Sequence, residues 1–111
     1  MTQTQDSGAR ANVPAPPDSF NFAQHLLGLN AARASKAAFI DDAGTVTYGE
    51  LADRVKRLAA GVRSLGLKRE ERVLLLMHDC ADWPVSFLGA MSARVVPDAV
   101  TTLQPADAYA Y

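Results

Sequence analysis

The sequence predicts an α/β domain in which helices pack on a partly parallel sheet, and three observations lead to this fold class. Apolar residues recur at alternating intervals of four and three over residues 48–65, which is the pattern of an amphipathic helix. A continuous apolar run follows at residues 72–77, as in strands that helices cover on both faces. A helix followed by such a strand is half of a β-α-β unit, and 111 residues suffice for one such domain.

The composition excludes several functional classes. With 11 basic and 12 acidic residues, the chain lacks the basic excess of a nucleic-acid-binding domain. No apolar run approaches the ~20 residues that cross a bilayer, and the first ten residues lack the regions of a secretion signal. The single cysteine, Cys80, excludes an intramolecular disulfide. We therefore expect a cytoplasmic protein with no nucleic-acid and no membrane partner.

Two segments differ in composition. Residues 1–18 are polar and rich in Ala and Pro, so they bury too little apolar surface to offset the entropy of ordering. We expect a disordered or extended tail there and an α/β subdomain over residues 19–111.

A first helix is predicted over residues 22–34 from the helical spacing of its apolar residues. Asn21 and Gln24 resemble a capping box at its start, in which each side chain bonds an early backbone N–H. His25 lies in the first turn. We assign it a solvated or packing role, with a catalytic base as the alternative, because no Asp or Ser partner accompanies it.

Two short β-type runs, residues 37–41 and 45–47, flank Asp42-Ala43-Gly44 and predict a small hairpin. Gly44 suits the positive φ of a hairpin turn. One glycine without a following Gly-Lys-Ser or Gly-Lys-Thr does not form a phosphate-binding loop.

The helix over residues 48–65 carries the strongest local signals. Thr47 and Glu50 form a Thr-x-x-Glu capping box before it, and Gly66 supplies the left-handed position after it. Two acid–base pairs at i,i+4 spacing support the helix: Glu50 with Arg54 and Asp53 with Arg57. We interpret its basic residues as a solvated face and not as an anion site, because acids are interleaved with them.

The strand over residues 72–77 is followed by His78-Asp79-Cys80, at the carboxyl edge where ligands bind in doubly wound sheets. Three consecutive residues cannot converge on one atom, and thiolate–imidazole pairs normally come from separate elements. We interpret the three as a structural turn and helix cap, and a nucleophile or ligand is the alternative.

A third helix is predicted over residues 82–93, with Asp82 as its cap and Pro84 in its first turn. Small residues on one side of this helix allow close packing on a sheet. We interpret Trp83 as a core anchor in preference to a ligand-stacking platform. Residues 95–100 then predict a further strand, and a last helix begins near residue 105.

Several segments in order resemble the adenylate-forming enzymes, which comprise acyl- and aryl-CoA synthetases, luciferases and adenylation domains. Val46-Thr47-Tyr48-Gly49-Glu50-Leu51 resembles a motif near the start of these enzymes. The amphipathic helix, the strand over residues 72–76 and Phe87-Leu88-Gly89-Ala90 follow at the family's spacing. Residues 21–23, 37–40 and 82–84 are most similar to bacterial benzoate–CoA ligases.

The resemblance implies an enzyme that activates an aromatic carboxylate with ATP and Mg²⁺ and transfers it to CoA. It also implies that the catalytic, cofactor-binding and metal-binding residues lie outside this sequence, so we assign none here. The chain corresponds to an incomplete piece of the amino-terminal domain, a scaffold. We expect it to be inactive alone and to associate with the remainder of the parent enzyme or with a second copy of itself.

Three residues depart from the family pattern. The family usually has a small residue or Gly at Arg94, an apolar residue at Asp98 and Asn at Thr101. Asp98 is the unusual one, because a carboxylate in a strand covered on both faces is costly unless it is paired or protonated. An exposed strand or an altered tail would each explain it.

The alternative function is a stand-alone α/β interaction module whose apolar face binds a partner protein. Such a module should end after a completed element, whereas this sequence stops near the expected first turn of a helix at residues 107–109. We therefore favour the ligase scaffold.

Overall fold

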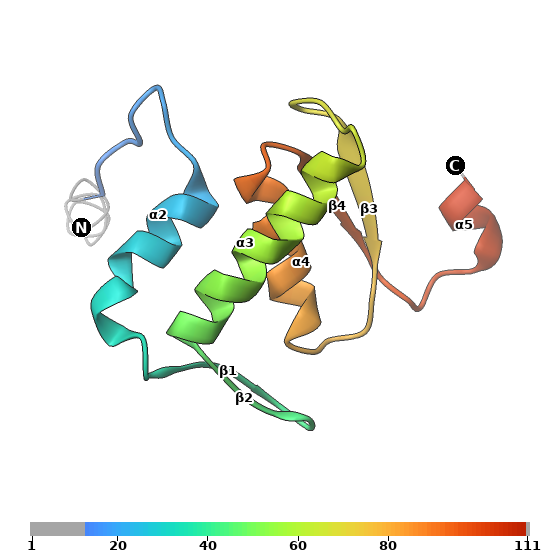
Figure 1. Ribbon diagram of the computed structural model, residues 1–111. Coiled ribbons are helices and arrows are strands. Elements are labelled where there is room, and N and C mark those ends of the chain that lie inside the picture. Colours follow the sequence, from blue (N-terminus) through green and yellow to red (C-terminus); the bar gives the residue numbers. More distant parts are fainter. Residues whose placement is uncertain (1–12, 111) are drawn as a thin grey trace, which may run out of the picture.

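The computed structural model describes residues 13–110 (Figure 1). The helices are α2 (Phe22–Leu29), the short 3-10 helix η1 (Ala31–Arg33), α3 (Tyr48–Ser64), α4 (Asp82–Ser92) and α5 (Ala106–Ala110). The strands are β1 (Ala37–Asp41), β2 (Gly44–Thr47), β3 (Arg72–Leu76) and β4 (Val96–Val100). Of the predicted tail, residues 1–12 lie outside the described residues, and residues 13–18 are exposed and form no helix or strand.

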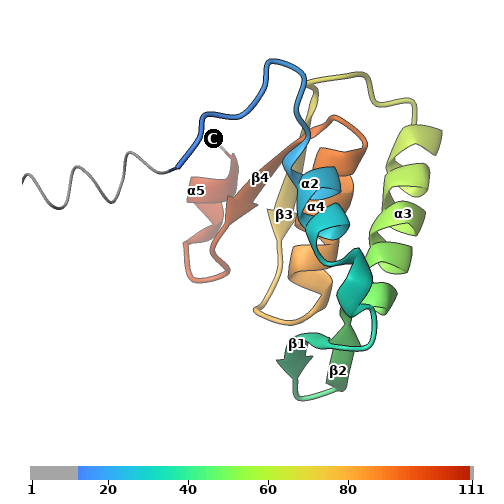
Figure 2. The same ribbon diagram turned by 90° about the vertical axis from the view of Figure 1, so that its left-hand side faces the viewer.

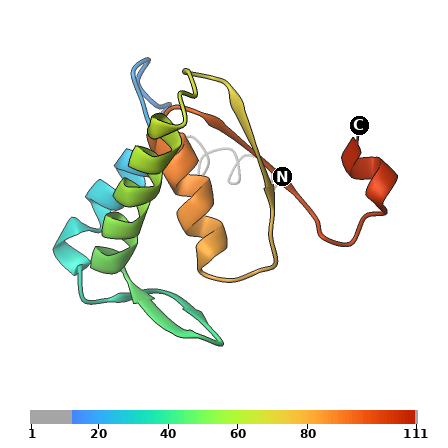
Figure 3. The same cartoon turned by 45° about the vertical axis from the view of Figure 1, so that its right-hand side comes forward.

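The elements form layers on one side of a two-stranded sheet. β3 and β4 pair in parallel, from Arg72 opposite Val96 to Leu76 opposite Val100. α4 connects the two strands and packs on both of them, while α2 and α3 pack on α4 (Figures 2 and 3). The antiparallel β1–β2 hairpin lies at the end of the molecule where α3 begins. This arrangement confirms the predicted α/β class. The β-α-β unit, however, consists of β3, α4 and β4. The sequence predicts that the helix over residues 48–65 belongs to such a unit together with the strand that follows it, but α3 comes after β2, which lies in the separate hairpin.

The core lies between the helices and the hairpin. Leu51 and Val55 from α3 have the largest fully buried side chains, which confirms the apolar stripe predicted for this helix. The other buried members of the cluster come from four different segments: Ala23, Val46, Ala81, Val85 and Leu88.

The first helix is shorter than predicted. α2 ends at Leu29, and a 3-10 turn replaces the last turn of the expected helix over residues 22–34. The buried Asn30 side chain donates to the Leu26 carbonyl (Nδ2 to O, 2.9 Å), which takes an acceptor from the helix. At the other end Asn21 accepts the Gln24 N–H as predicted.

The expectation that strand 72–77 is buried on both faces is wrong. β3 alternates: Leu75 is buried, while Leu74 and Leu76 are 56% and 45% exposed. α4 packs on this sheet from one side, with α3 beyond it (Figure 3). Among the described residues no helix packs on the other side, where Figure 3 shows α5 lying apart from the two strands. The outer face, as we call it below, comprises Arg72, Leu74, Leu76, Val96, Asp98 and Val100.

Two expectations for α4 are also corrected. Asp82 is not its cap but its first residue, and Ala81 occupies the cap position without a side-chain hydrogen bond. The small residue Gly89 allows α4 to pack closely on α3 and not on the sheet, because a Cβ at this position would lie 2.5 Å from Leu58 Cδ2.

Candidate functional site

The candidate site lies at the carboxyl ends of β3 and β4, which meet because the strands are parallel. The segments that follow the strands line an open depression of about 410 Å³. His78 and Asp79 contribute from the first segment and Thr102 from the second. The His78 Nδ1 atom lies 3.5 Å from the Thr102 hydroxyl oxygen, and both His78 and Asp79 are exposed.

Cys80 faces a different place from His78. It is half-buried and lines a neighbouring apolar depression of about 380 Å³ together with Asp79, Trp83 and Phe87. The three consecutive residues of the predicted constellation therefore do not line one common site. This geometry offers no nucleophile paired with a base.

Trp83 does not occupy the core as expected. Its ring is half-buried and stacks on Phe87, with centroids 4.9 Å apart and planes inclined by 12°. It lies between the two depressions and lines both of them. His25 is exposed and packs on Phe20, with ring centroids 5.1 Å apart.

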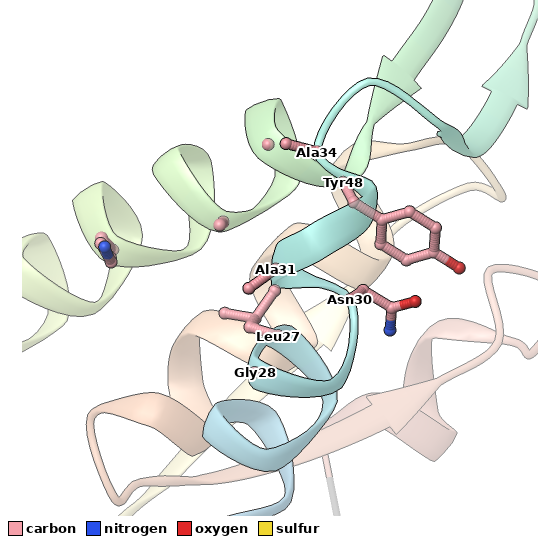
Figure 4. Close-up of a pocket in the computed structure, with 9 residues that line it drawn as sticks. Leu27, Gly28, Asn30, Ala31, Ala34 and Tyr48 are labelled. Carbon is pink, nitrogen blue, oxygen red and sulfur yellow. The ribbon is translucent and has the colours of Figure 1, made fainter.

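A third depression, of about 350 Å³, lies between α2, η1 and the start of α3 (Figure 4). Figure 4 shows the Tyr48 ring and the Asn30 amide at one end of it. Its wall is otherwise made of small and aliphatic residues, with Lys56 as the one cation. This lining carries no acid–base or nucleophilic pair.

The structure shows the surroundings of the three residues that depart from the family pattern. Asp98 pairs with Arg72 on the outer face, with Nη1 3.0 Å from Oδ1 and 3.2 Å from Oδ2. Arg94 adopts a left-handed backbone with a φ of 66°, a conformation that glycine adopts without strain. The Thr101 hydroxyl accepts the Leu103 N–H at 3.1 Å and so orders the turn after β4.

The described residues contain no group of three or more His, Cys, Asp or Glu side chains that could hold a metal ion. The edge depression presents the Asp79 carboxylate and one imidazole, where a triphosphate needs several cations or N–H donors. None of the described helices is long and apolar enough to cross a membrane.

Comparison with known proteins shows the family to which this chain belongs. The sequence profile of the AMP-binding enzymes matches residues 29–111. The chain therefore belongs to the AMP-binding enzyme family, the adenylate-forming enzymes that the motif at residues 46–51 resembles.

Among individual proteins, it is similar to the amino-terminal segment of bacterial benzoate–CoA ligases. The benzoate–CoA ligase of Thauera aromatica is 45% identical over 98 residues, which is 86% of this chain and 19% of that enzyme. The 4-hydroxybenzoate–CoA/benzoate–CoA ligase of Rhodopseudomonas palustris is 38% identical over 98 residues, 86% of this chain and 18% of that enzyme.

A solved structure shows the same fold at the same position. The benzoate CoA ligase of Burkholderia xenovorans LB400 superposes with a TM-score of 0.82 and 50% sequence identity, covering 84% of this chain and 19% of that one. The chain thus spans about a fifth of the length of the relatives it matches.

Proposed function

We propose that this chain is the amino-terminal scaffold of a cytoplasmic, ATP-dependent aromatic acid–CoA ligase. The full reaction would convert benzoate, ATP and CoA to benzoyl-CoA, AMP and pyrophosphate. The observation that carries the proposal is the 45% identity to the Thauera aromatica enzyme over 98 residues. The superposition on the Burkholderia xenovorans enzyme, with a TM-score of 0.82 and 50% sequence identity, also supports it.

In this proposal the segment has a structural role in the enzyme and does not contact the substrate. ATP, Mg²⁺ and CoA bind elsewhere in the enzyme, and the isolated chain has no activity. Its partner is either the remainder of the enzyme or a second copy of itself, and the surface involved is the outer face. Support for that choice comes from the exposure of Leu74 and Leu76 there, since large apolar patches mark interaction surfaces.

A segment exchange tests the proposed function. The matching 98 residues of the Thauera aromatica benzoate–CoA ligase are replaced by those of this chain, and benzoyl-CoA formation is measured. We expect a folded chimera that forms benzoyl-CoA and keeps the recipient's preference among benzoate and its hydroxylated analogues. A folded chimera without adenylation activity, or with a changed substrate preference, would contradict the scaffold role.

A further inference from the structure

Asp41 ends β1 and makes hydrogen bonds in two directions. Its Oδ1 atom accepts the backbone N–H of Ala43 at 2.9 Å and that of Gly44 at 3.1 Å. These bonds close the turn of the β1–β2 hairpin in the manner of an Asx turn. They are local, since all three residues lie within four positions of one another.

The second oxygen of Asp41 reaches another part of the chain. Oδ2 accepts the backbone N–H of Ala81 at 2.9 Å, across 40 residues. Ala81 is the cap residue of α4 and has no side-chain hydrogen bond of its own to offer this helix. Asp41 therefore satisfies a backbone donor at the start of α4 and places a negative charge at the positive end of the helix dipole.

We propose that Asp41 is a positioning residue, whose two carboxylate oxygens tie the hairpin turn and the loop from β3 to α4 together. That loop, residues 77–81, borders both depressions at the sheet edge. Asp41 thereby sets the place of Cys80 and of the first turn of α4. The proposal concerns the fold of this segment and holds whether or not the ligase function is correct.

Asparagine cannot replace Asp41 in this role. Its amide has one acceptor oxygen and one donor nitrogen, so it can satisfy the hairpin turn or the Ala81 N–H but not both. The neighbouring carboxylate Asp42 is exposed in the same turn and offers a matched control.

The electrostatic surroundings are consistent with an ionised Asp41. Its pKa lies below the ordinary 3.8, first because of the Ala81 N–H and then because of the Ala43 N–H, while partial desolvation opposes them. Arg54 on α3 adds a favourable charge. The nearby carboxylates are Asp42 in the turn, Asp79 in the loop and Asp82 in the first turn of α4.

The sign of the pH dependence follows from that direction. Because folding lowers the pKa, the contribution of Asp41 to stability is complete above the unfolded pKa near 3.8. It is lost as the pH falls through the lower, folded-state pKa. The hydrogen bonds that the Asp41 carboxylate accepts therefore persist throughout the neutral pH range and are lost only in acid.

Two measurements on the 111-residue chain test the proposal. Asp41→Asn removes one acceptor oxygen, so we expect either the Ala81 amide or the Ala43 and Gly44 amides to exchange hydrogen about tenfold faster, as for the loss of one hydrogen bond to a charged group. Where the Ala81 amide loses its acceptor, alkylation of Cys80 by a maleimide near pH 7 should also be faster. Asp42→Asn should leave all of these rates unchanged. Wild-type exchange at all three amides in Asp41→Asn would overturn the proposal.

A titration of the unaltered protein covers the case in which Asp41→Asn does not fold. The amide resonances of Ala43, Gly44 and Ala81 are followed by NMR as the pH is lowered. We expect all three to move with one common midpoint below 3.8, because one carboxylate accepts from all of them. An Ala81 resonance that does not follow the other two would overturn the proposal.

Discussion

Thr47 and Glu50 start α3 with hydrogen bonds that run in both directions. The Thr47 hydroxyl oxygen accepts the Glu50 N–H at 3.2 Å, and Glu50 Oε1 accepts the Thr47 N–H and hydroxyl at 3.0 Å each. The Thr47 N–H first, and its hydroxyl second, hold the pKa of Glu50 below the ordinary 4.5. The stability that Glu50 contributes is therefore complete above pH ~4.5 and is lost as the pH falls through the lowered pKa.

Removing the Thr47 hydroxyl tests this start of the helix. We expect Thr47→Ala to lower the free energy of unfolding by about 1 kcal/mol, because the Glu50 N–H loses its acceptor. The pH dependence of stability in the acid range should also become shallower. Chemical denaturation between pH ~3 and ~7 measures both effects.

Thr45→Ala is the matched control, since Thr45 is an exposed threonine two residues earlier in β2. We expect it to change stability by less than about 0.5 kcal/mol. Equal losses from the two substitutions would show that the capping box does not stabilise α3.

The sequence predicts residue roles where both partners are close in the chain. Thr47 and Glu50 lie three residues apart, and their pairing follows from spacing alone. Asp98 has its partner Arg72 26 residues away, and the pair forms only because of the β3–β4 register. For that reason the sequence identifies Asp98 as unusual without showing how its charge is satisfied.

Among the helices and strands, α4 has backbone groups at both ends that form hydrogen bonds with side chains from other segments. Asp41 accepts from Ala81 at its start, while Asn21 donates to the Met91 carbonyl at 2.8 Å and Arg63 to the Ser92 carbonyl at 3.1 Å at its end. The partners lie 40, 70 and 29 residues away in sequence. Local pattern predicts that α4 exists but misassigns its cap to Asp82, because its real end contacts are tertiary.

The contact of α3 with α4 requires a glycine at position 89. A Cβ there would lie 2.5 Å from Leu58 Cδ2 and 2.9 Å from Leu58 Cβ, so the helices would have to separate. We expect Gly89→Ala to destabilise the fold by about 1–2 kcal/mol, because overpacking exceeds the gain in helix propensity. Thermal or chemical denaturation measures the loss.

The same substitution at Gly61 is the control. Gly61 is exposed on α3 and a Cβ there meets nothing within 4 Å. We expect Gly61→Ala to stabilise the protein by about 0.5–1 kcal/mol through helix propensity alone. Stabilisation by Gly89→Ala of the same size would contradict the close packing of α3 on α4.

At the scale of the whole molecule, the sequence predicts the order of elements and the parallel pair but not the exposure of the sheet. The run from Val73 to Met77 is typical of a strand covered on both faces, yet the structure covers only the face with Leu75. An apolar run in the sequence indicates that a strand can be buried. It does not show which helices or strands pack on each face of that strand.

The uncovered outer face should make the isolated chain associate. We expect sedimentation velocity to show a mass that increases with concentration, because Leu74 and Leu76 offer apolar area and the strand edges offer free backbone groups. Leu74→Gln should weaken the association. Leu65→Gln is the control, since Leu65 is 77% exposed at the end of α3 and away from this face.

Two outcomes would contradict the prediction that the chain associates through its outer face. One is a monomeric mass at every concentration. The other is an association that Leu65→Gln weakens as much as Leu74→Gln does, because it would show that general hydrophobicity and not the outer face is responsible.

We propose that this segment is scaffold, so that the ligand-binding residues of an AMP-binding enzyme lie outside it. Calorimetric titration of the isolated chain with ATP plus Mg²⁺, and separately with benzoate, shows whether it binds either ligand. We expect no saturable heat of binding for either ligand up to millimolar concentration. Saturable binding of ATP or benzoate at millimolar or lower concentration would contradict the account and place a ligand site within these residues.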